Sequence, residues 1–161
     1  MSVAASLSTL AEAFAPSPAA LSAYRGLAAI ADEGALSAPM RRRLAVALAA
    51  QGGCPHCLSA ATADARDAGL TGNEIIANAL GYSQDARAER GVAFALCVFQ
   101  RRGAAADDAL AAVRAAGYSE AEIAEMVVHV ALAALSSAMG TLARLPAQLD
   151  GPASFAVPVG P

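Results

Sequence analysis

The sequence predicts an all-α protein with about seven helices in a single domain of 161 residues. Alanine accounts for 46 residues, and it is the strongest helix former because it has no side-chain entropy to lose. β-Branched and aromatic residues, which favour strands, are scarce, with three Tyr, four Phe and no Trp. Hydrophobic residues make up 57% and charged residues 16%, a balance that excludes a disordered chain.

Each predicted helix begins at a capping signal, and all but the last end at glycine. The start signals, in order, are Ser17-Pro18, Ser37-Ala38-Pro39, Cys54-Pro55, Thr71 to Glu74, Ser83, Asp107 or Asp108, and Ser119 to Glu122. The matching ends are about Glu33 before Gly34, Gly52-Gly53, Gly69, Gly81, Gly103, Gly117 and, without glycine, about Leu145. Serine and threonine caps accept a hydrogen bond from a free N–H group of the first turn, and proline fits that turn because it has none. The fourth and seventh helices begin with capping boxes, in which a glutamate three residues on returns the bond.

Domain organisation follows from the same signals. The connections are short, so neighbouring helices are expected to pack antiparallel. Residues 1–152 are predicted to form one all-helical domain, and residues 153–161 an irregular, proline-containing tail.

Charge and targeting signals narrow the class of protein. The formal net charge is −3 and all 11 basic residues are arginine, so a lysine Schiff base or a P-loop lysine is excluded. The acidic balance argues against a nucleic-acid partner. No positively charged leader precedes an apolar run, so we expect a cytoplasmic protein. The uncharged segment Met126–Ala143 is interpreted as a bundle helix and not a membrane span, because it is rich in alanine and contains His129, Ser136 and Ser137.

The sequence Gly53-Cys54-Pro55-His56-Cys57 carries the chemistry. Free N–H groups and the dipole at a helix start stabilise a thiolate, and one helical turn brings the second sulfur within disulfide reach of the first. His56 can exchange protons near neutral pH. Cys54, Cys57 and His56 are therefore the candidate catalytic residues of a redox-active dithiol, with no cofactor.

Other interpretations of these cysteines stay open: a static disulfide, inert thiols or a zinc site. Zinc needs four ligands, and only Cys97 and His129 remain, so no metal is expected. Cys97 follows Phe94-Ala95-Leu96 and is interpreted as a small core residue. His129 is interpreted as a buried histidine, with a place in a pocket wall as the alternative. Arg41-Arg42-Arg43 is expected to be a solvated helix face or a subunit ion-pair site.

Several motifs together resemble the alkylhydroperoxidase D-like, carboxymuconolactone decarboxylase superfamily. The resemblance covers roughly residues 20 to 152, and its most specific part is Cys54 to Ala61 followed by Gly69-Leu70 and Glu74-Ile75. Further segments fit: Phe94-Ala95, Arg114 to Glu125, His129 to Leu132, and Asp150-Gly151-Pro152. The resemblance implies an all-α fold, a homo-oligomer (trimer or hexamer) and thiol peroxidase chemistry on a small peroxide or disulfide substrate, with a thiol reductant protein as a possible partner.

The chain departs from the family motif at two positions of its proton relay. Arg42 stands where the family has a glutamate, twelve residues before the first cysteine, and Ala61 where it has a histidine, four residues after the second. Asp64 is a nearby acid that could replace the glutamate. We expect nucleophilic thiols but slow peroxide turnover, because an arginine stays protonated and cannot relay protons.

The attacking cysteine is left open at this stage. Position favours Cys54, the expected N-cap and the more exposed sulfur, whereas the resemblance favours Cys57. The function predicted is a peroxidase-like, antioxidant oxidoreductase with an incomplete relay. The alternatives are a binding or redox-sensing module that lost peroxidase activity, and a carboxymuconolactone decarboxylase-like lyase.

Overall fold

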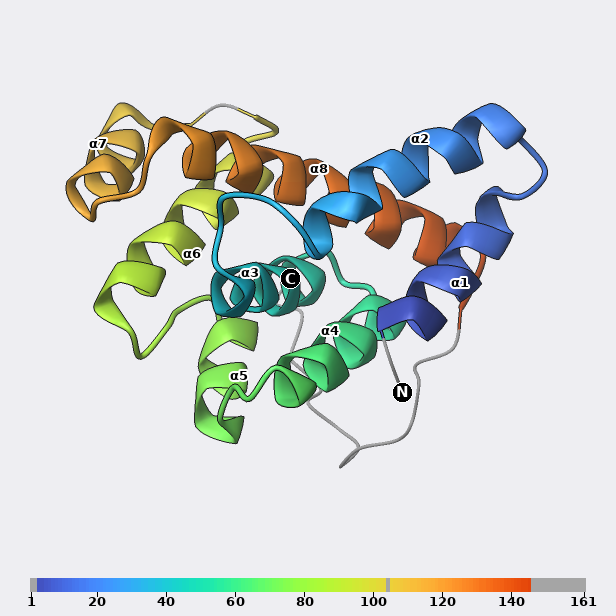
Figure 1. The fold of residues 1–161 in the computed structure, drawn as a ribbon, viewed down its shortest axis with the longest axis horizontal. Helices are drawn as coiled ribbons and strands as arrows, with labels where there is room; N and C mark the ends of the chain where they lie inside the picture. The colour runs from blue at the N-terminus through green and yellow to red at the C-terminus, as the bar shows by residue number, and fades with distance from the viewer. Residues whose placement is uncertain (1–2, 104, 146–161) are drawn as a thin grey trace, which may run out of the picture.

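Helix α3 (Ala38–Gln51) lies at the centre of the fold, and four other helices pack around it (Figure 1). The structure is a computed structural model that describes residues 3–103 and 105–145. Its remaining elements are α1 (Val3–Phe14), α2 (Pro18–Ala28), the 3-10 turn η1 (Ala29–Ala31), α4 (Pro55–Asp67), α5 (Gly72–Ala79), α6 (Ala86–Gln100), α7 (Asp107–Ala115) and α8 (Glu120–Leu142). The described residues include no strand, so the all-α fold is confirmed. The expected tail, 153–161, lies outside the described residues.

The predicted caps form most of the helix starts. Ser17, Ser37, Cys54 and Thr71 each accept a hydrogen bond from the backbone N–H three residues on. Ser119 completes the predicted capping box of α8 with Glu122. Each of these bonds satisfies a donor that the helix itself leaves unpaired. The sequence therefore places the start of α4, on which the candidate site depends, at the correct residue.

The helices differ from the prediction in one additional helix and in two boundaries. The structure contains one helix more than expected, α1, which has no capping signal before it and so went unrecognised. Helix α2 ends at Ala28 and tightens into η1, instead of continuing to about Glu33. The cap of α6 is Asp85 and not Ser83, since the Ser83 hydroxyl donates to Glu74 instead.

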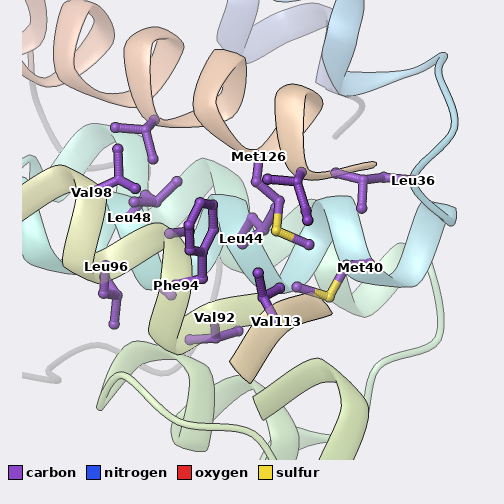
Figure 2. Packing of buried hydrophobic residues seen from close by; sticks show 14 of the residues in the cluster. Leu36, Met40, Leu44, Leu48, Val92, Phe94, Leu96, Val98, Val113 and Met126 are labelled. Carbon is purple, nitrogen blue, oxygen red and sulfur yellow. The ribbon is translucent and has the colours of Figure 1, made fainter. Parts of the chain in front are cut away.

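The main core lies between α3, α6 and α8 (Figure 2). Leu44 and Val92 are fully buried there, and Met126 reaches the same cluster from α8. Gly91 lets α6 approach this core closely, because a Cβ at that position would lie 2.5 Å from Met40 Cε and 2.9 Å from the Tyr118 hydroxyl. Small residues thus bring the helix axes together where few large side chains are available to fill space.

Helix α8 is, among the described residues, the one helix long and apolar enough to cross a membrane by length and composition. It packs against α1, α2, α3 and α6 through a buried face that includes Ile123, Met126 and Val130. Only 33% of the apolar 18-residue stretch of this helix is buried, and Val127 on the outer face is 44% exposed. The helix therefore belongs to the bundle and leaves an apolar face uncovered.

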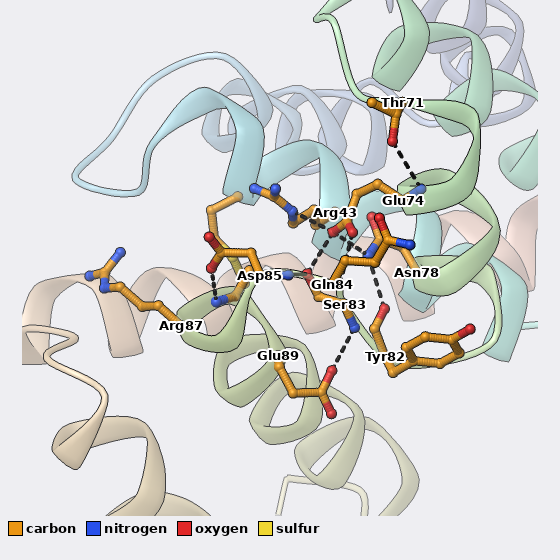
Figure 3. Close-up of polar contacts among 12 residues, drawn as sticks. Arg43, Thr71, Glu74, Asn78, Tyr82, Ser83, Gln84, Asp85, Arg87 and Glu89 are labelled. Carbon is orange, nitrogen blue, oxygen red and sulfur yellow. Dashed lines mark hydrogen bonds and ion pairs between the residues drawn. The ribbon is translucent and has the colours of Figure 1, made fainter.

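The carboxylate of Glu74 organises the junction of α3, α5 and α6 (Figure 3). Oε1 accepts from Arg43 Nε at 2.7 Å, Asn78 Nδ2 at 3.0 Å and Ser83 Oγ at 2.5 Å, and Oε2 accepts from the backbone of Gln84 at 2.9 Å. Burial alone would raise the pKa of Glu74, but these hydrogen bonds outweigh it and lower the pKa to about 2. The ionised carboxylate is the form that the fold requires.

We predict that Glu74→Gln lowers the free energy of unfolding at pH 7 by about 2–3 kcal/mol, because a pKa difference of about 2.5 corresponds to roughly 3 kcal/mol. The folded pKa lies below the unfolded value of 4.5, so this contribution is complete above pH 4.5 and is lost as the pH falls toward 2. Denaturant unfolding at several pH values measures it. Glu33→Gln, which removes an exposed carboxylate, is the matched control; an equal loss in both variants would contradict the assignment.

Candidate functional site

The first turn of α4 holds both cysteines of the candidate site. Cys54 is the N-cap, and its sulfur accepts a hydrogen bond from the backbone N–H of Cys57 at 3.2 Å. Pro55 follows at the first helical position, where its missing N–H costs nothing. The two Cα atoms are 5.2 Å apart and the sulfurs are joined in a disulfide. The turn therefore brings the two sulfurs together as the spacing predicts.

The exposure of the two sulfurs is the reverse of the expectation. Cys54 is only 2% exposed, so the prediction that it is the more accessible sulfur is wrong. Cys57 is half-buried and lines a cavity in the bundle. His56, between them, is 1% exposed and is not part of the cavity wall. A small molecule in the cavity would meet Cys57, and not Cys54 or His56.

Helix α8 explains why Cys54 is covered. A Cβ placed on Gly140 would lie 2.8 Å from Cys54 Sγ and 3.5 Å from Cys57 Sγ. Only glycine allows α8 to pass this close to the sulfurs without displacing them. The backbone of α8 thus forms a lid over the first turn of α4 and leaves Cys57 open on its other side.

The cavity has a volume of about 120 Å³ and lies between α2, α3, α4 and α8. Its wall is mostly apolar, formed by leucines and alanines of these helices and by Leu10 of α1. Its polar lining residues are Tyr24, Arg41, Arg42, Cys57, Asp64, His129, Ser136 and Ser137. An apolar hollow with a few converging polar groups is the usual form of a small-molecule site.

The two departures from the relay pattern both face this cavity. Arg42 and Ala61 line its wall together with Cys57. The Arg42 guanidinium donates to the Ala31 carbonyl at 3.2 Å and pairs with Asp32 at 3.0 Å. Its charge is therefore held beside the cavity instead of reaching into solvent.

The three consecutive arginines do not form a solvated face, so the first of the two interpretations of this run is wrong. All three are partly buried and each binds within the chain. Arg43 pairs with Glu74 and Arg42 with Asp32. Arg41 donates to the Leu36 carbonyl at 2.5 Å and the Asp32 carbonyl at 3.0 Å. Successive helix positions point about 100° apart, so the three side chains reach three different surroundings.

Asp64 is the one carboxylate among the residues that line the cavity. It follows Cys57 by seven positions and Ala61 by three, so all three lie on one face of α4. Burial raises the pKa of Asp64, and the charge of Arg42 partly offsets this rise. The carboxyl group of Asp64 thus lies in the same cavity as the Cys57 sulfur, in surroundings that favour its protonated form more than water does.

His129 lies in the wall of the cavity, which was the alternative interpretation of this residue. It is 5% exposed and lines the cavity from α8. Burial, with smaller effects of Arg41 and Arg42, lowers the pKa of His129 to about 4, against an opposing effect of Glu125. The imidazole is therefore neutral near pH 7.

The expectation for Cys97 is wrong. Cys97 is half-buried and not a core residue, although it lies in an apolar stretch of α6. No group of three or more His, Cys, Asp or Glu side chains converges within the described part of the chain.

The sequence analysis did not identify Tyr24, Ser136 and Ser137 as residues of the site, because only the packing of α2 on α8 brings them to the cavity. Burial raises the pKa of Tyr24, and the Ser136 side chain partly opposes it.

Comparisons with known proteins agree with this architecture. The model of the carboxymuconolactone decarboxylase family matches residues 15–96. A solved structure described as an uncharacterized peroxidase-related protein from Silicibacter sp. TM1040 superposes with a TM-score of 0.72 at 18% identity, covering 82% of this chain and 72% of that one. At that identity the likeness establishes the fold alone. No curated protein matches the chain significantly.

We predict that mild oxidation of the reduced protein yields one disulfide, between Cys54 and Cys57, and leaves Cys97 as a thiol. The short Cα separation allows that bridge, and Cys97 is the free cysteine of the structure. Peptide mass mapping after alkylation identifies the bridged pair. A bridge to Cys97 would contradict the arrangement of α4 and α6.

Proposed function

Because the chain belongs to the carboxymuconolactone decarboxylase family, we propose that it is a thiol-dependent peroxidase that uses the Cys54–Cys57 dithiol. The observation that carries the proposal is that Cys57, in the first turn of a helix, lines a cavity that it shares with the protonatable Asp64. A thiolate at a helix start is stabilised by free N–H groups and the helix dipole. A peroxide in the cavity would therefore meet a nucleophile, and the same cavity contains a carboxyl group.

The dithiol is oxidised in two steps and is then reduced again by an external dithiol. The Cys57 thiolate attacks one oxygen of the peroxide, the O–O bond breaks, and the leaving oxygen takes up a proton to depart as an alcohol or water. Cys57 is then a sulfenic acid. The Cys54 thiol displaces its hydroxyl as water and forms the disulfide. An external dithiol, itself oxidised to a disulfide, restores the two thiols.

Proton delivery to the leaving oxygen limits this reaction. Arg42 stays protonated and Ala61 has no proton to give, so neither can serve as the acid. Asp64 is the acid of the cavity, but it lies two helical turns from Cys57, a rise of roughly 10 Å along α4. We therefore propose slow turnover, with Asp64 as the proton source.

The function is tested by oxidising reduced Cys54→Ser and Cys57→Ser with hydrogen peroxide and cumene hydroperoxide. Cys54→Ser lacks the resolving thiol and should trap a sulfenic acid at Cys57, detected by a dimedone adduct. Cys57→Ser is the matched control and should form none at Cys54, which α8 covers. No adduct at Cys57 would overturn the proposal and favour a binding or sensing role, or the lyase alternative.

We predict that Arg42→Glu with Ala61→His raises the rate of peroxide consumption by roughly 10²–10⁴-fold, the usual contribution of general acid–base catalysis. The double variant should exceed the product of the two single variants, because a relay needs both groups. Asp32→Asn is the control, since it breaks the Arg42 ion pair without supplying an acid. An unchanged rate in a folded double variant would contradict proton delivery as the limiting step.

We also propose that the protein is a homo-oligomer whose subunits meet through the uncovered face of α8. Val127 is 44% exposed and Leu142 79% exposed on this helix. Burial of such apolar side chains against a second copy is favourable, and a core of small residues has little area of its own to bury.

We predict that Val127→Glu converts the oligomer into smaller species, because it places a charge within the apolar contact. Ala111→Glu, at an exposed position of α7, is the control. Sedimentation velocity at micromolar concentration measures the change. A monomeric wild-type protein, or equal effects of the two variants, would contradict the interface.

A further inference from the structure

Four buried polar atoms in the wall of the cavity have no hydrogen-bond partner. They are Tyr24 Oη, Arg41 Nε, His129 Nε2 and Ser137 Oγ. His129 and Ser137 are 5% and 6% exposed, so solvent outside the protein does not reach them freely. Buried polar groups are nearly always paired in folded proteins. Four such atoms in one cavity indicate that the cavity receives a polar group from a bound molecule.

The charges around the cavity favour an anion. Arg41 is absent from the ion pairs of the described residues, and its two terminal nitrogens donate to neutral carbonyl groups. Its guanidinium therefore has no carboxylate partner within ion-pair distance in the described part of the chain. Arg42 lies beside it and is paired with Asp32, whose side chain is 60% exposed, so that pair is partly screened by water.

The remaining charged and titratable groups of the wall do not reverse this balance. Asp64, on α4, interacts with the charge of Arg42 and is not among the groups that act on His129. His129 is neutral near pH 7 and can donate a hydrogen bond from Nε2 or accept one. Glu125, one turn before His129, accepts hydrogen bonds from the backbone N–H groups of Ala35 and Leu36 and keeps its negative charge, but its effect on the pKa of His129 is smaller than that of Arg41. The end of the cavity formed by α3 and the middle of α8 is therefore positive and rich in donors.

The other end of the cavity contains the Cys57 sulfur and is mainly apolar, with Ser136 and Ser137 as its polar side chains on α8. Gly140, which packs on the sulfurs, follows His129 by eleven residues, or roughly 16 Å along α8. Leu10, Leu132 and alanines line the space between. The volume of about 120 Å³ is close to that of cavities of about 150 Å³ that bind benzene.

We propose that this cavity binds a small organic monocarboxylate, with its carboxylate on Arg41 and His129 and its apolar body directed toward Cys57. A guanidinium and a carboxylate form a strong charge-assisted pair, and burial strengthens it. Binding itself is independent of the peroxidase proposal. If that proposal also holds, an inference that rests on it follows: the preferred substrate is an organic hydroperoxide that carries a carboxylate.

Binding is tested with benzoate, benzamide and benzylamine on the oxidised wild-type protein by isothermal titration calorimetry. The three probes share a phenyl ring and differ in the charge of the head group. Benzoate should bind at least about tenfold more tightly than benzamide, and benzylamine should not bind. Equal binding of benzoate and benzamide, or no binding of benzoate at millimolar concentration, would overturn the proposal.

Variants locate the site on the protein. Arg41→Gln removes the charge and His129→Phe removes the unpartnered nitrogen, and each should weaken benzoate binding about tenfold or more. Arg25→Gln is the matched control, because Arg25 is an exposed arginine beside Tyr24 on α2. Arg41 also holds the 32–36 segment, so circular dichroism must show a folded variant, and His129→Phe provides the test without breaking those bonds. An equal loss in Arg25→Gln, or no loss in folded His129→Phe, would exclude this site.

The peroxide experiment separates the two proposals. Benzoate should protect Cys57 from oxidation in Cys54→Ser, with half-protection near its dissociation constant. Benzoate binding without any Cys57 adduct would retain the carboxylate site and reject the peroxidase. A Cys57 adduct with no benzoate binding would do the reverse.

Discussion

The contact between Gly140 of α8 and the first turn of α4 is the constraint on which the site depends. It brings a helix backbone to the two sulfurs so closely that a Cβ would collide with Cys54. This contact buries one sulfur and leaves the other at the cavity wall. It also sets the line of α8, and hence the positions of His129, Ser136 and Ser137 around the same space. A single absent side chain thus determines which cysteine can meet a small molecule.

The arginines of α3 show how charge is distributed around that space. Arg43 points to the α5 junction, where Glu74 neutralises it and ties the helices together. Arg42 is neutralised at the rim by a solvent-exposed partner. Arg41 binds only carbonyl groups and keeps its charge. One short run of sequence therefore supplies a structural ion pair, an ion pair with an exposed partner, and an arginine with no carboxylate of the described residues within ion-pair distance.

The same arrangement explains how the chain combines a family fold with an unusual site. The positions that carry the relay of the resembling family still face the cavity here, but they hold Arg42 and Ala61. The change removes a carboxylate and an imidazole and adds positive charge and space. Such a cavity is less suited to rapid proton transfer and better suited to an anionic molecule. The proposals of slow peroxide turnover and of carboxylate binding both rest on this change.

The sequence by itself determined the helical fold and the local geometry of the cysteine turn. Alanine content, capping residues and glycine stops act within a few residues of chain, so they predict most helix starts and place Cys54 as the N-cap of α4. Helix α1 (Val3–Phe14) was not predicted because its sequence carries no such local signal.

Only the tertiary structure decided which residues share the cavity. The burial of Cys54, the access to Cys57 and the place of His129 in the wall all result from contacts between α4 and α8, whose residues lie far apart in the sequence. The separate surroundings of Arg41, Arg42 and Arg43 depend on which helices pack beside α3. No local sequence pattern reveals long-range packing of this kind. A small residue such as Gly140 has its effect by allowing a distant segment, here the first turn of α4, to lie close to the helix backbone.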